Sequence, residues 1–292
     1  MRNILKTSVA LAFMLLSGLA GQNLQIIHMD GVYDLDNDDL VEFIAFEQDR
    51  ETGGVVSRVA YYEIDDLGFP QLIWNLDTPQ KIDGNIVAAR ITDLNGSGTS
   101  ELFIAANVKT ADNRDLSQGV LYVYDWMGSG FSTEPALSTA LTDPQSGQAI
   151  SNIDIVDLEG DGKEEVAIAL TGPEAVVTVI GLSDGEERLF NEIQSFLLQD
   201  FSTSAGYIHV AGVDFDRDGL SDLFAFSPER NILRIQSFLN SGGVLGAGPN
   251  LLHRVPGMSN LLTRSIATLC LLYTSDAADE GLGVDLGGRR II

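Results

Sequence analysis

The chain has 292 residues, of which 45% are hydrophobic, and it carries a formal net charge of −25. The hydrophobic fraction is large enough for a packed core and excludes an intrinsically disordered acidic protein. The charge argues against nucleic acid and anionic membrane surfaces as partners, and solubility alone is its simplest explanation.

The first twenty residues have the pattern of a secretory signal peptide. Arg2 and Lys6 form a positive end, and the apolar stretch TSVALAFMLLSGLA that follows is short for a membrane span. Gly18 and Ala20 are small residues that suit cleavage after Ala20. We expect residues 1–20 to be removed and the mature protein to be secreted, extracellular or periplasmic, or associated with the cell envelope, without insertion into a membrane. An uncleaved anchor is the alternative.

After this leader, an acidic unit recurs about every sixty residues. The segments DLDNDDLVE, DLNGSGTSE, DLEGDGKEE and DFDRDGLSD begin at Asp34, Asp93, Asp157 and Asp214, so their starts are 59, 64 and 57 residues apart. Self-similarity at a fixed period indicates a repeat architecture.

Each unit contains short runs rich in Val, Ile, Tyr and Phe, bounded by Gly, Asp, Asn and Pro, which is typical of strands and hairpins. Outside the leader, only residues 187–193 hint at a helical period. Four strands per unit predict an all-β fold, a partial β-propeller of about four four-stranded antiparallel blades over residues 21–269. Separate β-sandwiches and a β-solenoid are the alternatives. The runs lie at 85–92, 149–156 and 207–213 before the acidic segments, at 40–47, 101–107, 165–170 and 222–227 after them, then at 57–64, 119–126, 175–182 and 231–238, and finally at 70–76 and 188–198.

The acidic segments carry oxygen ligands at alternate positions. Counted from the first Asp, positions 1, 3 and 5 bear side-chain oxygens, position 7 would add a backbone carbonyl, and position 9 is a carboxylate. Alternating side chains of a tight loop converge on one centre, and about six to eight mixed oxygen donors suit calcium. Glycine at position 6, which permits a positive φ, is present in three of the four segments as Gly98, Gly162 and Gly219. The candidate ligands are Asp34, Asp36, Asp38, Leu40 and Glu42; Asp93, Asn95, Ser97, Thr99 and Glu101; Asp157, Glu159, Asp161, Lys163 and Glu165; and Asp214, Asp216, Asp218, Leu220 and Asp222.

We therefore expect up to four structural calcium ions. No His or Cys joins these segments, which disfavours zinc and softer metals. Magnesium, which prefers strict octahedral geometry and its own waters, and Asp/Gly-rich turns without metal are the alternatives. The number of charged ligands ranks the segment at 214–222 first and the segment at 93–101 last.

The pattern D-x-D-x-D-G-x-x-D/E between two strands, at this period, resembles the FG-GAP or VCBS repeats of integrin-type β-propellers. The resemblance covers about Leu24 to Leu269. It implies that each loop joins two strands within a blade and binds calcium, and that a complete propeller has about six to eight blades. Two positions depart from the pattern. Asp39 replaces the glycine of the first loop, which Asp tolerates better than most residues do, and the second loop has Asn95 and Ser97 in place of carboxylates.

The last segment, Cys270–Ile292, breaks the pattern of the repeats and contains the single cysteine of the chain, which excludes an intrachain disulfide. It resembles the translation of a transposon-type sequencing-library adapter, and VDLGGRRII fits the other end of the same adapter. We therefore expect residues 270–292 to be a non-native tail and the natural chain to continue beyond Leu269.

Two functional classes are consistent with these observations. The first is a secreted, non-catalytic scaffold that mediates adhesion or binds a protein or carbohydrate ligand at a propeller face. The second, which the family resemblance allows, is the propeller portion of a secreted carbohydrate-active lyase or hydrolase. A purely structural role is a third outcome. The sequence has no nucleophile elbow, HExxH or glycine-rich phosphate loop, so we expect no catalysis by these residues. Arg90, Trp74, Tyr122 and Trp126 could line a sugar site, but packing in the core is the simpler expectation.

Overall fold

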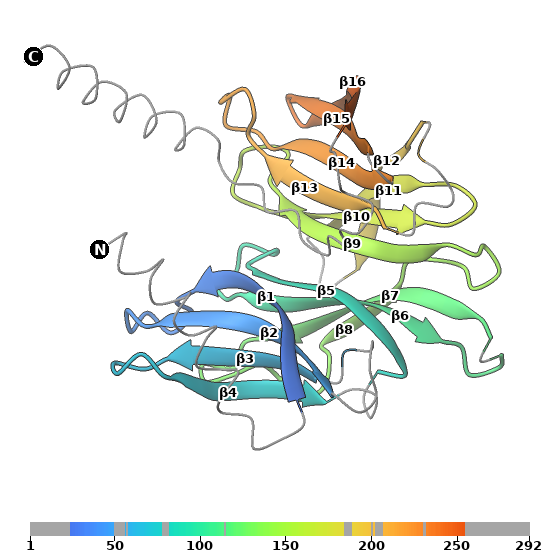
Figure 1. The fold of residues 1–292 in the computed structure, drawn as a ribbon. Coiled ribbons are helices and arrows are strands. Elements are labelled where there is room, and N and C mark those ends of the chain that lie inside the picture. The colour runs from blue at the N-terminus through green and yellow to red at the C-terminus, as the bar shows by residue number, and fades with distance from the viewer. Residues whose placement is uncertain are drawn as a thin grey trace, which may run out of the picture.

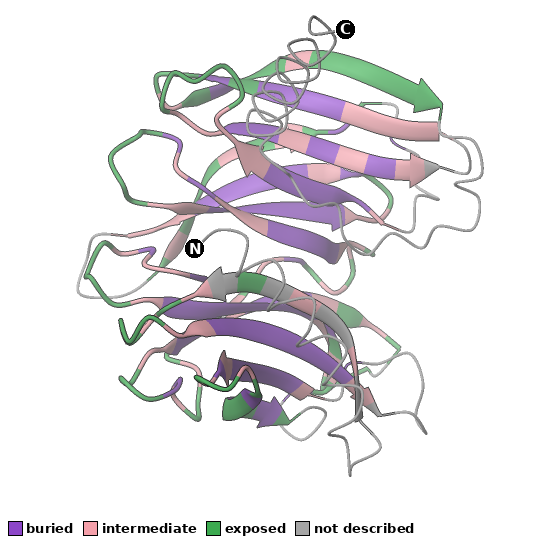
Figure 2. Cartoon of the chain, turned by 60° about the vertical axis from the view of Figure 1, so that its left-hand side comes forward, coloured by how far each residue is buried: buried purple, intermediate pink, exposed green. Residues whose placement is uncertain are grey.

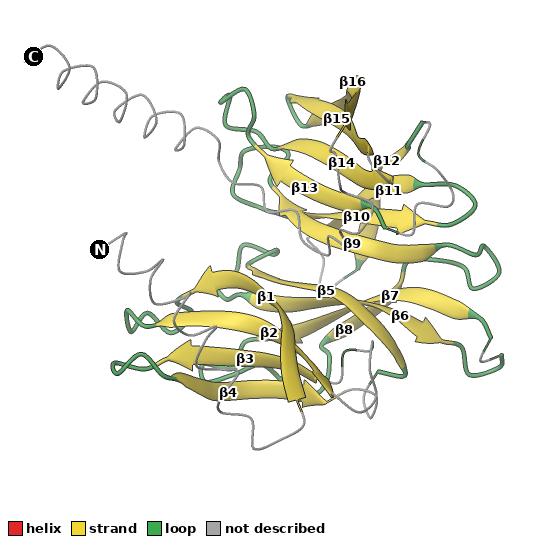
Figure 3. Ribbon diagram, viewed as in Figure 1, coloured by secondary structure: helices red, strands yellow, loops and turns green. Residues whose placement is uncertain are grey.

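The computed structural model describes residues 24–49, 56, 58–77, 82–113, 115–183, 189–199, 201, 207–229 and 232–254. The predicted signal peptide (1–20) and the adapter-like segment (270–292) lie outside these ranges. Every regular element in the described ranges is a β-strand (Figure 3), which confirms the all-β prediction. The stretch that hinted at a helical period falls partly in a strand, Phe190–Leu197. No helix in the described ranges is long and apolar enough to cross a membrane.

The strands form four antiparallel sheets, and each sheet consists of four strands that are consecutive in the chain. We call these sheets blades 1 to 4. Blade 1 contains β1 (Leu24–Tyr33), β2 (Val41–Asp49), β3 (Arg58–Ile64) and β4 (Pro70–Asp77); blade 2 contains β5 (Gly84–Thr92), β6 (Glu101–Lys109), β7 (Ser117–Asp125) and β8 (Leu137–Ala140); blade 3 contains β9 (Ala149–Val156), β10 (Glu165–Thr171), β11 (Val176–Leu182) and β12 (Phe190–Leu197); and blade 4 contains β13 (His209–Val213), β14 (Asp222–Glu229), β15 (Ile232–Ser241) and β16 (Val244–Arg254).

The blades follow one another in chain order, as the colours of Figure 1 show. The first strand of each blade is innermost, because β1 contacts β5, β5 contacts β9, and β9 contacts β13. The fourth strand lies at the opposite edge of each sheet. This is the blade arrangement of a β-propeller, so the prediction of about four four-stranded antiparallel blades is confirmed. The run pattern did not anticipate the strands β1, β8 and β16.

The core lies between the blades and follows the two-residue period of the strands. In β2, Ile44 and Phe46 belong to a buried cluster shared with blade 2, whereas Phe43 and Ala45 belong to a cluster on the other face. In β6, Phe103 likewise joins the cluster shared with blade 3. The second and third strands of blades 1 to 3 are therefore largely buried on both faces, which Figure 2 shows as purple bands within the stacked sheets.

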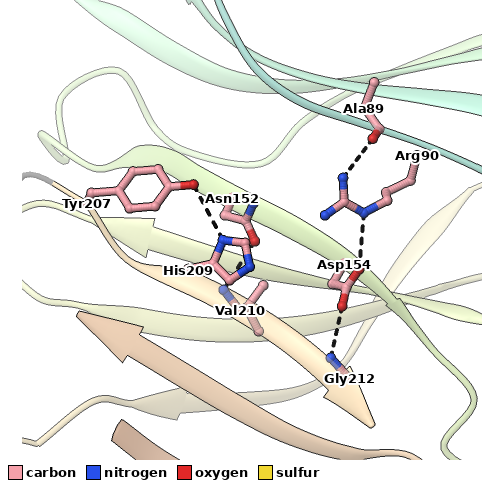
Figure 4. A network of polar contacts seen from close by, with 8 residues as sticks. All are labelled: Ala89, Arg90, Asn152, Asp154, Tyr207, His209, Val210 and Gly212. Carbon is pink, nitrogen blue, oxygen red and sulfur yellow. Dashed lines mark hydrogen bonds and ion pairs between the residues drawn. The ribbon is translucent and has the colours of Figure 1, made fainter. Parts of the chain in front are cut away.

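The inner strands of neighbouring blades are joined by polar side chains (Figure 4). Asp154 of β9 accepts a hydrogen bond from the Gly212 N–H of β13 at 2.9 Å and forms an ion pair with the Arg90 Nε of β5 at 3.1 Å. Asn152 accepts a further hydrogen bond from the Val210 N–H at 3.1 Å. Side chains of β9 thus connect three blades, and they hold β9 and β13 parallel to each other.

Candidate metal centre

The four acidic segments are the loops that connect the innermost strand of each blade to the second strand. We call residues 34–42, 93–101, 157–165 and 214–222 loops 1 to 4. Loops 3 and 4 are in contact, because the Asp157 N–H donates to the Ser221 Oγ at 3.1 Å and the Ser221 N–H donates to the Asp157 carbonyl at 2.8 Å. Loop 2 approaches loop 3, since a Cβ on Gly96 would lie 4.0 Å from the Lys163 Cγ. Loops 2, 3 and 4 therefore lie side by side at one end of the inner strands.

All four loops share one backbone conformation, with a positive φ at positions 4 and 6. Asp39, which stands where the other loops have glycine, has a φ of 67°, as its tolerance of this region predicts. The sequence analysis did not predict the positive φ at position 4, because only two of the four residues at this position are glycine. The residues with positive φ are Asn37, Gly96, Gly160 and Arg217 at position 4, and Asp39, Gly98, Gly162 and Gly219 at position 6.

The first Asp of each loop accepts hydrogen bonds from the loop backbone. In loop 4, Asp214 accepts from the Asp218 N–H at 3.1 Å and from the Gly219 N–H at 3.2 Å. The side chain at position 5 then accepts from the N–H of position 7, as in the 2.9 Å bond from Leu220 to Asp218. The same bond occurs in the other three loops from Leu40, Thr99 and Lys163. These bonds fix the N–H of position 7, and the expected role of its carbonyl as a ligand stays a prediction.

The carboxylate at position 9 connects the end of each loop to its beginning. In all four loops it accepts a hydrogen bond from the N–H of position 2, and in loops 1, 2 and 4 the residue is buried. In loop 4 its second oxygen accepts from the Asn240 N–H of β15 at 2.7 Å, which ties the loop to its own blade. The four bonds are Leu35 to Glu42 at 2.7 Å, Leu94 to Glu101 at 3.3 Å, Leu158 to Glu165 at 3.0 Å and Phe215 to Asp222 at 3.0 Å.

Two loops bring three carboxylates together. Ligand atoms of Asp34, Asp36 and Asp38 in loop 1 lie within 4.8 Å of one another, and the corresponding atoms of loop 4 do so as well. Two oxygens bound to one calcium ion at about 2.4 Å are at most about 4.8 Å apart. The donor sets of loops 1 and 4 therefore fit a hard cation that binds oxygen. In loop 4 the three residues are Asp214, Asp216 and Asp218.

Loops 2 and 3 provide no such triad among the described residues. In loop 2 the Asn95 amide donates to the Glu101 Oε1 at 2.7 Å, so two expected ligands bind each other. In loop 3 both oxygens of Asp157 accept backbone bonds, from Gly160 at 2.7 Å and Gly162 at 3.1 Å, as those of Asp214 do in loop 4. The described acids of loop 3 nevertheless do not converge within 4.8 Å of one another. The number of charged ligands ranked loop 4 first and loop 2 last, and the geometry groups three carboxylates in loops 1 and 4.

Burial and like charges act on the acidic groups around the loops. The pKa of Glu165 is raised to about 7, first by burial and then by the charges of Asp157, Glu159 and Asp161. Burial also raises the pKa of Glu42, with a further contribution from Asp36 and Asp34. A bound cation opposes these shifts, because its positive charge favours the ionised carboxylates.

A second group of acids lies where the sequence pattern did not point. Ligand atoms of Asp36, Glu42 and Glu63 are within 4.8 Å of one another, and Glu63 belongs to β3 rather than to the loop. Beside this group, the Tyr61 hydroxyl is buried and has no hydrogen-bond partner. The pKa of Tyr61 is raised by burial and next by the charge of Glu42, which lies close to the hydroxyl without meeting hydrogen-bond geometry.

The aromatic residues considered for a sugar site are part of the core. Trp74 is buried and contacts Tyr124 and Phe131 with ring centroids 5.8 and 5.5 Å apart. Tyr122 and Trp126 pack against the same cluster between blades 1 and 2. Packing, the simpler expectation, is therefore what the structure shows for these three side chains, and Arg90 is paired with Asp154.

No family model and no curated protein matches this chain, so the resemblance to FG-GAP and VCBS repeats stays a prediction. Among solved structures, the chain is similar to the rhamnogalacturonan lyase PL11 of Bacillus licheniformis, with 12% identity and a TM-score of 0.46 over 76% of this chain and 50% of that one. It is also similar to the exotype rhamnogalacturonan lyase YesX, with 13% identity and a TM-score of 0.46 over 81% and 48% of the two chains. Rhamnogalacturonan lyase YesW is 13% identical to this chain, with a TM-score of 0.45 over 76% of this chain and 50% of that one. The chain thus spans about half of the length of each of these proteins, and similarity at this level carries no information on activity.

Proposed function

We propose that this protein is a secreted β-propeller whose loops bind calcium and whose blades form a non-catalytic scaffold for a protein or carbohydrate ligand. Calcium has a structural role in this proposal. It neutralises the clustered carboxylates of each loop and fixes the connection between the two innermost strands of a blade. The ligand would bind at a propeller face, where loops from several blades lie together.

The observation that supports the proposal best is the convergence of three aspartates in loops 1 and 4 on a shared backbone conformation. Like charges at this density repel one another unless a cation lies among them. Oxygen is the only ligand type within these triads, which favours calcium or a similar hard cation over zinc. The repeated hydrogen bond to position 9 shows that all four loops have the same design, although the triads form in two of them.

Calcium binding is tested by thermal unfolding of the full chain in millimolar calcium and in chelator. A ligand that binds only the folded state stabilises it by about 2.7 kcal/mol at a hundredfold excess over its Kd. We expect a clearly higher melting temperature in calcium than in chelator and a smaller effect of magnesium. Identical melting curves in calcium and chelator would contradict calcium binding.

The scaffold role is tested by comparing binding with cleavage. We expect the protein to retain immobilised glycans or proteins in calcium, to release them in chelator, and to leave the chain length of acidic polysaccharides unchanged. Shortening of a polysaccharide by the purified protein would overturn the non-catalytic part of the proposal and favour the carbohydrate-active enzyme instead.

A further inference from the structure

We infer that blade 1 holds a second cation centre, formed by Asp36, Glu42 and Glu63, beside the triad of loop 1. The cation class is a hard divalent ion of the size of calcium. Asp36 belongs to both groups of ligands, so its carboxylate would bridge the two ions. The inference rests on the proposed cation binding of loop 1 and adds a ligand, Glu63, that the repeat pattern does not contain.

The pairing of β2 with β3 creates this group of acids. Glu42 and Glu63 are direct partners across the two antiparallel strands, where side chains on the same face are close and like charges destabilise the pair. Asp36 approaches from the loop above them, and the three ligand atoms lie within 4.8 Å of one another. No ion pair in the described part of the structure brings a Lys or Arg to these three carboxylates. The group therefore has three converging acids and, within the described ranges, no Lys or Arg paired with them.

The Tyr61 hydroxyl gives a second indication of a ligand, because it lies beside Glu42 without meeting hydrogen-bond geometry. It lies two residues before Glu63 on β3, so both side chains point to the same face of the sheet. Only 1% of the residue is exposed, and its hydroxyl has no hydrogen-bond partner. Buried hydroxyl groups are normally satisfied by protein or by ordered water. A hydrated cation held by Glu42 and Glu63 would supply such a water to the Tyr61 hydroxyl.

The other blades lack this combination. Opposite position 9, Asp125 is the partner of Glu101 in blade 2, Gly181 lies beside Glu165 in blade 3, and Leu239 follows the Leu223–Phe238 pair in blade 4. The place of Tyr61 is taken by Val123, Val179 and Ser237. Even in blade 2, where two acids face each other, the Asn95 amide already donates to Glu101. The inferred centre is thus a specific property of blade 1.

The number of bound ions tests this inference directly. Calcium titrations by calorimetry compare the full chain with its Glu63→Gln variant, and Asp66→Asn serves as the control because it removes the same charge from an exposed turn of the same blade. We expect Glu63→Gln to bind one calcium ion fewer than the unmodified chain and Asp66→Asn to bind the same number. If circular dichroism in chelator shows that Glu63→Gln does not fold, Glu63→Asp replaces it, and we expect weakened binding of one ion.

Terbium luminescence tests the position of the ion. Tyrosine transfers excitation to terbium bound nearby, so Tyr61→Phe should lower the sensitised emission while the number of bound ions stays the same. An unchanged number of calcium ions in Glu63→Gln, with or without weaker binding, would overturn the second centre, as would unchanged terbium emission in Tyr61→Phe. A chain that binds no calcium at all would instead refute the proposed function.

Discussion

At the scale of single residues, burial and neighbouring acids raise the pKa of Glu165. Its pKa of about 7 exceeds the ordinary value of 4.5, mainly because the side chain is partly buried. Without metal, the folded state therefore binds an additional proton between these two values, and stability falls as the pH rises through that window. In the proposed calcium-bound state this preference would reverse, because a cation stabilises the ionised form.

We therefore expect Glu165→Gln to have opposite effects with and without calcium. In chelator at about pH 8, the variant should melt at a higher temperature than the unmodified chain, and the difference should narrow toward about pH 5. In millimolar calcium it should melt at a lower temperature, because a charged ligand is lost. Thermal melts across this pH range measure both effects. A shift of the same sign in calcium and chelator at about pH 8 would contradict the proposed role of Glu165.

Charged and neutral side chains at the proposed ligand positions should contribute differently to calcium binding. Asp216 contributes a carboxylate to the triad of loop 4, whereas Asn95 contributes a neutral amide to loop 2, which has no triad. We expect Asp216→Ala to weaken calcium binding by at least about tenfold, or about 1.4 kcal/mol, and Asn95→Ala to change it less. Titration calorimetry ranks the two. If Asn95→Ala had the larger effect, carboxylate count would be the wrong measure of affinity.

At the scale of secondary structure elements, the close approach of β9 and β13 depends on a glycine. A Cβ on Gly212 would lie 2.4 Å from the Val156 Cγ1 and 3.1 Å from the Ile155 carbonyl, so any side chain there pushes the two inner strands apart. Overpacking of this kind costs about 1–3 kcal/mol. The same movement would lengthen the hydrogen bond from the Gly212 N–H to Asp154.

We expect Gly212→Ala to lower the free energy of unfolding by about 1–3 kcal/mol. Gly246→Ala in β16 is the matched control, because the nearest atom to its added Cβ, the Leu239 carbonyl oxygen, is 3.8 Å away. That change should stay within about 0.5 kcal/mol. Urea denaturation of both variants gives the comparison. Equal urea midpoints for the two variants would show that a side chain at position 212 does not destabilise the packing of blades 3 and 4.

At the scale of the whole molecule, the arc of blades ends in an apolar face. Phe224 and Phe226 of β14 occupy the positions at which Ile44 and Phe46 of β2 pack against the next blade. Among the described residues no further sheet covers them, and the adjacent Phe215 is 63% exposed with its ring centroid 5.6 Å from that of Phe224. Phe224 and Phe226 are half-buried, and partly exposed apolar surface of this kind favours association.

We therefore expect the chain to self-associate in solution and Phe224→Ser to reduce the association. Phe69→Ser is the control, since it makes the same change at a phenylalanine that is exposed in a hairpin of blade 1. Sedimentation velocity over a range of concentrations measures the distribution of species. A monomeric unmodified chain, or association that Phe224→Ser leaves unchanged, would exclude this face as the cause.

The sequence by itself determined the features that depend on local spacing. The two-residue alternation of apolar residues located most strands, and the sixty-residue period located the loops, because the conformation of a tight loop follows from its own residues. The structure decided what depends on pairing between segments far apart in the chain. Glu63 reaches the ligands of loop 1 through the register of β2 and β3, Tyr61 is buried by the contact of blades 1 and 2, and Asp154 joins three blades. Register and blade packing are set by long-range contacts, and a one-residue slip would turn each of these side chains to the other face.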